Sequence, residues 1–345
     1  MQALTLATHG GLDGLTLRDD LPLPELQRPD DVRIRVRSAA LNRLDLFVVA
    51  GLPGVKLDPD WPLGADAAGV VEAVGPAVTT VAVGDLVVVN PGISDRTCEY
   101  CRDGEQPLCT KFGILGEHMP GTLCEYVVVP AANVRSIPAT TPLDVAGAFA
   151  LATLTAWRMV VSRARVGPRD NVLIWGIGGG VALAALQICK QIGARVWVAS
   201  SSDDKLRRAA ALGADELLNR TQVDVGRAIR ERTGKRGVDV VVDNVGTATW
   251  SSSLHALGRR GRLVTCGATS GPMVETDVRR LFWNQWTIMG STMGNDAEFD
   301  AVVAELRAGR LAPPVDSVYS LTDGRAAFER LASGAQFGKV VIQIP

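Results

Sequence analysis

Residues 172–187 read Val-Leu-Ile-Trp-Gly-Ile-Gly-Gly-Gly-Val-Ala-Leu-Ala-Ala-Leu-Gln. A short apolar run with β-branched residues enters a glycine cluster and then an alanine-rich pattern, which predicts a buried strand, a tight turn and a helix. Such a turn lets bare backbone N–H groups and a helix N-terminus approach a pyrophosphate with no Cβ in the way. The turn therefore predicts a dinucleotide site formed by Gly176, Gly178, Gly179, Gly180 and Val181.

Strand and helix patterns alternate after this stretch. Further strands are expected at residues 195–199, 238–243, 261–267 and 287–292, with helices up to residue 192 and over residues 205–212. Repeated βα units of this length predict a parallel, doubly wound sheet with right-handed crossovers. We place this Rossmann-type domain at residues 152–292.

The remainder of the chain does not show this alternation of strands and helices. Residues 32–37 alternate strictly between apolar residues and arginine, which is typical of a half-solvated antiparallel strand. Helix patterns at residues 296–308 and 324–333 and an apolar strand at 339–342 do not extend the βα alternation. We therefore expect an α/β protein in which residues 1–151 and 293–345 form a second, β-rich domain.

The composition and charge of the chain disfavour several classes of function. The chain has 345 residues and a formal net charge of −1, which does not favour nucleic acid or an anionic membrane as a partner. No apolar run approaches the ~18 residues of a membrane span. The first residues carry no basic region or signal-like apolar segment. We expect a soluble, cytoplasmic protein that acts on a small molecule.

The end of the second strand of the parallel sheet bears on the choice of dinucleotide. Ser200 stands where an NAD-binding sheet places a carboxylate for the ribose hydroxyl, and that carboxylate would repel a 2′-phosphate. Asp203 and Asp204 are expected to act as the N-cap and first-turn acid of the next helix. NADP(H) is the predicted cofactor, because donors and positive charge that suit a phosphate gather here: Ser200, Ser201, Lys205 and Arg220.

Three of the six cysteines, Cys98, Cys101 and Cys109, fall within twelve residues. In a large cytosolic chain, such a cluster is more often a metal site than a disulfide framework. Cys124, Cys189 and Cys266 lie in apolar contexts and are expected to be small core residues.

Several separated motifs recur together: the cysteine cluster, residues 64–71 (Gly-Ala-Asp-Ala-Ala-Gly-Val-Val), the glycine turn and residues 337–341 (Phe-Gly-Lys-Val-Val). Their order and spacing resemble the medium-chain dehydrogenase/reductase superfamily, which includes zinc alcohol dehydrogenases and quinone oxidoreductases. The resemblance implies a GroES-like β-rich catalytic domain beside the Rossmann domain.

The resemblance also places the catalytic zinc ligands of the alcohol dehydrogenases, a Cys, a His and a second Cys, at Asn42, Ala65 and Leu151. None of these side chains binds zinc usefully, so we expect no catalytic zinc. The pattern Asn42-x-x-Asp45 instead resembles the zinc-free quinone oxidoreductase branch, in which Asn42 would lie beside the nicotinamide. Asn42 and Asp45 are the candidate catalytic residues.

Further cofactor contacts follow from the same resemblance. Arg43 and Lys339 match positions near the pyrophosphate, and Thr155 matches a threonine that touches the nicotinamide ring. Doubly wound sheets bind ligands at the carboxyl ends of their strands. Three residues that close the third and fourth strands are candidates on that ground: Asn244, Val245 and Gly267.

The cysteine cluster resembles the superfamily's structural zinc lobe, at about residues 91–112. The ligand spacing of that lobe gives Asp95, Cys98, Cys101 and Cys109 in this chain. Carboxylate and thiolate are both zinc ligands, so one structural Zn²⁺ per chain is expected. The alternative is a lobe that has lost its metal.

The predicted function is hydride transfer from NADPH to a quinone or activated enone without catalytic zinc. One alternative is a zinc-type alcohol dehydrogenase acting on a small alcohol or aldehyde, with metal ligands such as Asp45, Asp66 and His118. A second is a non-enzymatic NADPH-binding sensor or scaffold. We also expect a homodimer or homotetramer paired through the strand at residues 287–292. Candidate substrate-lining residues are Leu52, Pro53, Trp61 and Met293.

Overall fold

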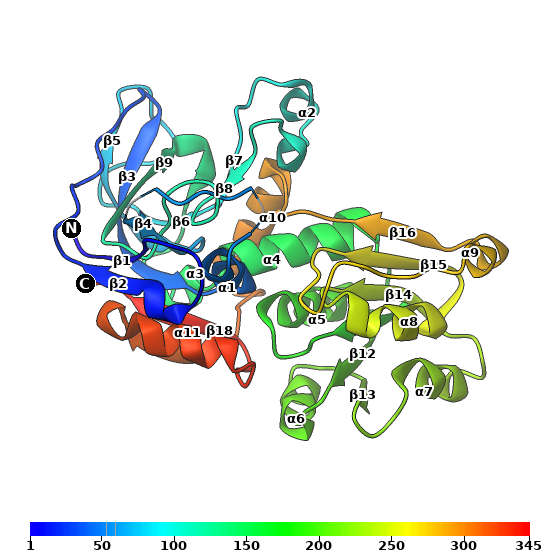
Figure 1. Cartoon of the computed structure of the whole chain (residues 1–345). Coiled ribbons are helices and arrows are strands. Elements are labelled where there is room, and N and C mark those ends of the chain that lie inside the picture. The colour runs from blue at the N-terminus through cyan, green and yellow to red at the C-terminus, as the bar shows by residue number, and fades with distance from the viewer. Residues whose placement is uncertain (53, 59) are drawn as a thin grey trace. The chain divides into compact units, whose positions relative to one another are not determined.

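The computed structural model describes residues 1–52, 54–58 and 60–345, so the predicted substrate-lining residue Pro53 lies outside the described residues. Contacts between residues divide the chain into two units (Figure 1). The parallel-sheet unit comprises residues 153–293. The β-rich unit comprises residues 1–152 and 294–345.

The parallel-sheet unit is built around β11 (Asn171–Trp175), the strand that leads into the glycine turn. Six parallel strands lie in the order β13-β12-β11-β14-β15-β16, which is the order of a doubly wound dinucleotide-binding sheet. The predicted fold class is therefore confirmed. The other strands are β12 (Arg195–Ser200), β13 (Glu216–Asn219), β14 (Val238–Asp243), β15 (Leu257–Thr265) and β16 (Thr287–Gly290).

Helices connect these strands. The core between them holds large apolar side chains such as Leu173, Trp197 and Ile229, each no more than 1% exposed. The helices are α5 (Gly180–Ile192), α6 (Asp203–Ala211), α7 (Val225–Arg232), α8 (Thr247–Ala256) and α9 (Val278–Asn284). None of the helices in the described ranges is both long enough and apolar enough to cross a membrane.

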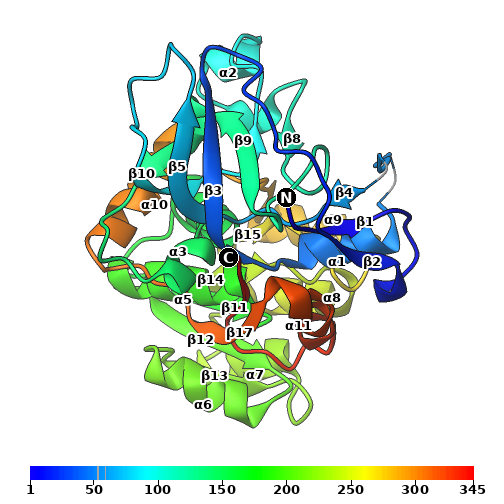
Figure 2. The same ribbon diagram turned by 90° about the vertical axis from the view of Figure 1, so that its left-hand side faces the viewer.

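The β-rich unit is organised around β3 (Asp31–Ala40). Val32, Ile34 and Val36 are fully buried while the intervening arginines are not, as the alternation predicts. The main sheet has the order β10-β6-β5-β3-β18-β17, and β9 also pairs with β3; Figure 2 shows β3, β5 and β9 side by side. The remaining strands of this sheet are β5 (Ala68–Val74), β6 (Leu86–Val89), β9 (Tyr126–Pro130), β10 (Val134–Ser136), β17 (Val315–Ser320) and β18 (Lys339–Gln343).

Two smaller sheets complete the strands of this unit. β1 (Ala3–Leu6) pairs with β2 (Leu15–Arg18) and β4 (Trp61–Pro62), and β7 (Gly92–Ile93) pairs with β8 (Gly113–Ile114). The last strand of the chain, β18, runs antiparallel to β3, so the C-terminal segment contributes directly to the sheet that the N-terminal segment begins.

Short helices flank these sheets: α1 (Arg43–Ala50), α2 (Glu99–Arg102), α3 (Leu143–Gly147), α10 (Asp296–Arg307) and α11 (Gly324–Ala332). α4 (Ala150–Trp157) begins in this unit and continues past its boundary. After α3 and α4, the chain forms a π-helical turn at Arg158–Arg163.

Candidate functional site

The glycine turn after β11 has the backbone that a close approach to a ligand requires. Gly176 and Gly178 have φ angles of 71° and 110°, which side chains with a Cβ rarely adopt. Gly179 is the N-cap of α5, and Gly180 and Val181 begin its first turn, where backbone N–H groups have no partner within the helix. With 13 residues, α5 is long enough for its N-terminus to attract an anion.

The ends of β14 and β15 meet this turn. A Cβ on Gly176 would lie 3.1 Å from Asn244 Oδ1 and 3.6 Å from a methyl of Val245. A Cβ on Gly267 would lie 3.3 Å from the Asn244 carbonyl oxygen. The structure therefore brings together four residues that were predicted to bind the cofactor from separate strands: Gly176, Asn244, Val245 and Gly267.

The corner after β12 carries hydroxyl groups. Ser200 ends the strand, is 7% exposed, and its Oγ accepts a hydrogen bond from the Ser202 N–H at 3.1 Å. The N-cap of α6 is Ser202, whose Oγ accepts from the Lys205 N–H, so the expectation that an aspartate caps this helix was wrong. Asp203 lies in the first turn and accepts a hydrogen bond from Asn219 at 2.7 Å.

Four other residues that were predicted to contact the cofactor differ in their burial and in their neighbours. Arg220 follows β13, and its backbone N–H donates to the Ser200 carbonyl at 2.9 Å, while Ser201 is exposed. Thr155 is buried, with its Oγ1 3.8 Å from Met293 Sδ. In the β-rich unit, the exposed Arg43 lies beside Gly334.

Lys339, the other predicted pyrophosphate contact, is engaged inside the β-rich unit. At the start of β18, its ammonium donates to Asn42 Oδ1 at 2.6 Å and to Asp66 Oδ2 at 2.8 Å. Asn42 Nδ2 in turn donates to the same Asp66 oxygen at 2.9 Å. These three residues are 3%, 7% and 0% exposed, so they form a closed polar triangle away from water. Its role at the pyrophosphate stays a prediction.

One further residue, Asp45, completes what we call the buried cluster, which comprises Asn42, Asp45, Asp66 and Lys339. The other Asp66 oxygen accepts the Leu151 N–H at 2.6 Å. Asp45, in the first turn of α1, accepts the Asn42 N–H at 2.6 Å and is 1% exposed. Burial raises the pKa of the Asp45 carboxyl to about 7, against the lowering effect of its hydrogen bonds and of Lys339.

The buried cluster does not fit a catalytic metal ion. Asn42 and Leu151, two of the three ligand positions that the resemblance implies, both donate hydrogen bonds to Asp66, which follows the third position, Ala65. The side chains of Leu151 and Ala65 carry no atom that can bind a metal. The amide of Asn42 and the carboxylate of Asp66 are already used by the Lys339 ammonium. Zinc prefers thiolate and imidazole ligands, and neither is present here.

The alternative ligand set of Asp45, Asp66 and His118 is not assembled. His118 has a 45% exposed side chain, and its Nδ1 lies 3.7 Å from Glu117 and 3.3 Å from the Ile114 N–H. Across residues 1–52, 54–58 and 60–345, one group of three or more His, Cys, Asp or Glu side chains is placed to share an ion, and it lies in the cysteine lobe.

The cysteine lobe, residues 91–112, brings its four predicted ligands together. The ligand atoms of Asp95, Cys98, Cys101 and Cys109 all lie within 4.8 Å of one another. Backbone N–H groups of Asp95 and Lys111 donate to Cys109 Sγ at 3.4 and 3.3 Å. Hydrogen bonds from the Thr97 and Cys98 N–H groups lower the pKa of the Asp95 carboxyl. This donor set fits Zn²⁺.

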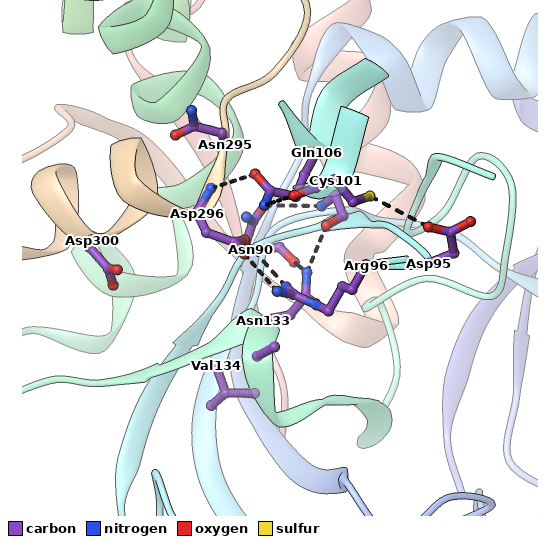
Figure 3. Close-up of polar contacts among 12 residues, drawn as sticks. Asn90, Asp95, Arg96, Cys101, Gln106, Asn133, Val134, Asn295, Asp296 and Asp300 are labelled. Atoms are coloured by element: carbon purple, nitrogen blue, oxygen red, sulfur yellow. Dashed lines mark hydrogen bonds and ion pairs between the residues drawn. The ribbon is translucent and has the colours of Figure 1, made fainter. Parts of the chain in front are cut away.

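A polar network, which the sequence did not predict, links the lobe to α10 (Figure 3). Arg96 donates to Asp296 at 2.6 and 3.3 Å and to Asn133 Oδ1 at 3.3 Å. Gln106 Oε1 accepts the Asp296 N–H at 3.4 Å. Arg96 has a φ of 58°, a conformation that costs energy for a residue with a side chain.

The sequence did contain a signal for the buried cluster. Asp66 lies in an otherwise apolar segment, and Lys339 begins an apolar strand. A charged residue in such a context is buried only when it is paired. The signal indicates that a partner exists, but residues 42, 66 and 339 are too far apart in the sequence for spacing to identify it.

Comparisons with known proteins agree with this architecture. Residues 28–139 match the family model described as the alcohol dehydrogenase GroES-like domain, and residues 180–308 match the model described as zinc-binding dehydrogenase. A solved structure titled as an NAD-dependent alcohol dehydrogenase superimposes with a TM-score of 0.95. It is 42% identical in sequence, with all of both chains covered.

Two sequence relatives bear on the reaction. The NAD-dependent alcohol dehydrogenase of Saccharolobus solfataricus is 31% identical over 340 residues, which cover 94% of this chain and 95% of that protein. The human quinone oxidoreductase is 25% identical over 349 residues, which cover 99% of this chain and 97% of that protein. Both kinds of oxidoreductase named by the sequence resemblance thus occur among the relatives.

Proposed function

Because the chain belongs to the medium-chain dehydrogenase/reductase superfamily, we propose that this oxidoreductase transfers a hydride between a nicotinamide dinucleotide and a small carbonyl or alcohol substrate without a catalytic metal ion. The proposal that no metal takes part rests on the buried cluster. There the oxygen atoms of Asn42 and Asp66 that could bind a metal accept hydrogen bonds from the Lys339 ammonium instead. The cofactor supplies the hydride, and the protein's part is to bind and orient it.

Interconversion of an alcohol and an aldehyde or ketone is the first candidate reaction. It is supported by similarity to proteins named alcohol dehydrogenases over essentially the full chain, one of them 42% identical. These comparisons fit this alternative better than the quinone or enone acceptor predicted from the sequence.

Reduction of a quinone or enone is the second candidate. It is supported by Asn42, Ala65 and Leu151 at the positions where the zinc enzymes carry ligands, and by the quinone oxidoreductase among the relatives. An acceptor whose carbonyl is conjugated spreads the charge left by hydride addition, so it depends less on a Lewis acid.

A substrate panel separates the two reactions. Oxidation of NADH and NADPH is followed with an aldehyde, a ketone, a quinone and an enal, and reduction of NAD⁺ and NADP⁺ with primary and secondary alcohols. Zinc per chain is measured on the same samples. We expect turnover with at least one substrate class and one zinc per chain. No turnover with any of them, or two zinc ions per chain, would overturn the proposal.

We further propose that the cysteine lobe binds one structural Zn²⁺ and that the preferred cofactor is NADP(H). The zinc is supported by the Asp95–Cys98–Cys101–Cys109 donor set and by the zinc-binding dehydrogenase match. NADP(H) is supported by Ser200 at the end of β12, although the alcohol dehydrogenases above are named NAD-dependent. Binding titrations with the four nucleotides test this preference.

A homodimer or homotetramer is also proposed. β16 lies at one end of the parallel sheet, and α9 next to it in sequence exposes Val278, Phe282 and Trp283 by 64%, 64% and 75%. An open strand edge beside exposed aromatic side chains favours association. Light scattering should give at least twice the mass of one chain, and F282E/W283E should lower it. A wild-type monomer would overturn this proposal.

A further inference from the structure

Residues 244–246, which we call the β14 turn, connect β14 to α8 inside the parallel-sheet unit. A fully buried carboxylate, that of Asp243, lies at the end of β14 and directly precedes this turn. We propose that Asp243 is a positioning residue for the nicotinamide half of the dinucleotide: its carboxylate fixes the shape of the β14 turn, and Ser270 holds the carbonyl group of the same turn. This inference rests on the proposed function and deepens it.

Both carboxylate oxygens of Asp243 are taken up by donors of the chain. Oδ1 accepts the N–H groups of Val245 at 2.8 Å and of Gly246 at 3.1 Å. Oδ2 accepts the hydroxyl groups of Thr249 and Ser253, each at 2.8 Å. Because a carboxylate offers about four acceptor sites, Asp243 has none left for a ligand. Its effect on a ligand must therefore pass through the β14 turn.

The start of α8 explains why a buried carboxylate is stable at this place. Gly246 is the N-cap of this helix of 10 residues, and Thr249 lies in its first turn. The N-terminus of a helix favours negative charge, and a polar group can be buried when its hydrogen bonds are made. Gly246 has a φ of 88°, and a Cβ on it would lie 2.5 Å from the Gly271 carbonyl oxygen. The backbone of the turn is therefore held in one conformation.

Ser270, in the loop after β15, binds the carbonyl of the β14 turn. Its N–H and its hydroxyl donate to the Val245 carbonyl at 2.8 and 2.7 Å. Its Oγ also accepts the Ala248 N–H at 3.0 Å. The N–H and the carbonyl of Val245 are thus both fixed, the first by Asp243 and the second by Ser270.

The strand order indicates which half of the dinucleotide depends on this turn. A doubly wound sheet binds a dinucleotide where the strand order reverses, which is here between β11 and β14. The adenosine ribose belongs at the end of β12 and the pyrophosphate at the N-terminus of α5, so we expect the nicotinamide half on the side of β14. The β14 turn lies against the glycine turn, since a Cβ on Gly176 would be 3.1 Å from Asn244 Oδ1.

The experiment measures the affinity for a dinucleotide and for a fragment that lacks nicotinamide and its ribose. NADPH is paired with 2′,5′-ADP and NADH with ADP, and the variants are tested with the pair whose dinucleotide the wild type binds more tightly. D243A removes the acceptors of the turn. It should weaken dinucleotide binding at least about tenfold and fragment binding less than about twofold.

D243N tests whether the hydrogen bonds carry the effect. Its Oδ1 can still accept from Val245 and Gly246, and the hydroxyl groups of Thr249 and Ser253 can rotate to accept from the new amide. We therefore expect D243N to recover most of the dinucleotide affinity that D243A loses.

S270A decides the question by the same criterion if D243A does not fold. Ser270 is exposed, so the loss of its hydroxyl leaves the core intact, and dinucleotide affinity alone should fall about threefold. T233V is the matched control at the opposite end of β14. The Thr233 hydroxyl likewise donates to a carbonyl, that of Ile229 at 2.7 Å, and accepts an N–H, that of Gly237 at 2.8 Å. T233V should bind dinucleotide and fragment as the wild type does.

Equal losses of dinucleotide and fragment affinity in D243A and S270A would overturn the inference, because a residue that only supports the fold affects both halves of the site. Wild-type dinucleotide affinity in both variants would overturn it as well, and turnover by the wild type would then leave the proposed function in place. A selective loss of dinucleotide affinity, in a protein that turns over no substrate, would refute the proposed function and retain the positioning role of Asp243.

Discussion

The cysteine lobe and the buried cluster lie in the same β-rich unit, and both correspond to places where zinc enzymes of this superfamily hold a metal. The lobe keeps three thiol groups and a carboxylate with their ligand atoms within 4.8 Å of one another. At the positions that the resemblance gives to ligands, the buried cluster has an amide, a methyl group and an isobutyl group, and the amide of Asn42 accepts a hydrogen bond from Lys339. The cysteine lobe has four side chains that can bind zinc, whereas Asn42, Ala65 and Leu151 in and beside the buried cluster do not form a zinc site.

The difference shows two ways to balance negative charge inside a protein. A zinc ion is held by soft donors and can be removed by a chelator. A lysine ammonium is covalently attached, so it needs no loading and cannot be exchanged. We therefore expect stability to depend on the metal in the lobe and, in the cluster, on the buried ion pair between Lys339 and Asp66.

The largest expected effect is the loss of the lobe's metal. C101S removes one of four ligands and should reduce the zinc content from one per chain to a small fraction. Where free zinc exceeds its dissociation constant about a thousandfold, the lost stabilisation is about 4 kcal/mol. Zinc content and the urea midpoint measure it. C266A, which removes a thiol outside the lobe, is the control, and equal zinc in C101S and C266A would contradict the prediction.

A smaller effect is expected from the carboxyl of Asp45. Its folded pKa of about 7 exceeds the ordinary value of 3.8, so the folded chain keeps a proton that the unfolded chain has lost. Stability from this group is therefore lost as the pH rises from about 4 to about 7. The charged groups that face Asp45 are Lys339 on β18 and Asp66 in the loop before β5.

D45N keeps the shape of the side chain and cannot titrate. Between pH 5 and pH 7 the wild type should lose about 2 kcal/mol relative to D45N, because one pKa unit corresponds to about 1.4 kcal/mol. Urea unfolding of both proteins at pH 5, 6 and 7 measures this difference. Parallel pH dependence in the two proteins would show that Asp45 is ionised throughout.

The same two regions show what sequence patterns can predict. The ligands of the lobe fall within residues 95–109, so the three clustered cysteines indicated a metal site, and the family resemblance added Asp95. The strand, turn and helix of residues 172–187 were predictable for the same reason, and they appear as β11 and α5. Local patterns were sufficient for these two regions, because the interacting residues are close in the sequence.

The triangle of Lys339, Asn42 and Asp66 was not predictable in this way, because 297 residues separate its first and last members. β13 was missed because its four residues, Glu-Leu-Leu-Asn, include no β-branched or aromatic side chain. The cap of α6 was assigned one residue too late, since serine and aspartate are similarly good N-caps. Tertiary pairing and short strands therefore required the structure.

The third prediction, with a smaller expected effect, concerns the choice between NADP(H) and NAD(H) at the corner after β12. S200D would place a carboxylate where it can accept hydrogen bonds from a ribose hydroxyl and repel a 2′-phosphate. We expect the ratio of NADPH to NADH affinity to fall at least about tenfold, which is about 1.4 kcal/mol. S251D adds the same charge to an exposed position of α8 and should leave the ratio unchanged. An unchanged ratio in S200D would remove Ser200 from cofactor selection.

The smallest effect concerns the link from the lobe to α10. Arg96 stands between the ligands Asp95 and Cys98 and makes a two-point contact with Asp296, at the start of a helix whose capping box is formed by Asn295 and Glu298. R96M should cost about 1 kcal/mol, as expected for a partly exposed ion pair of good geometry. Faster hydrogen exchange is expected in the first turn of α10.

The ion pair between Arg310 and Glu305 is the matched control, because it has two contacts of 2.7 Å and joins no part of the lobe. R310M should lose a similar amount of stability and leave zinc retention against a chelator unchanged, whereas R96M should release zinc faster. Equal zinc release from both variants would mean that the lobe holds its metal independently of α10. Faster release from R96M alone would mean that the contact between Arg96 and Asp296 helps the lobe to hold its metal, so that the lobe and the C-terminal segment of the β-rich unit stabilise each other.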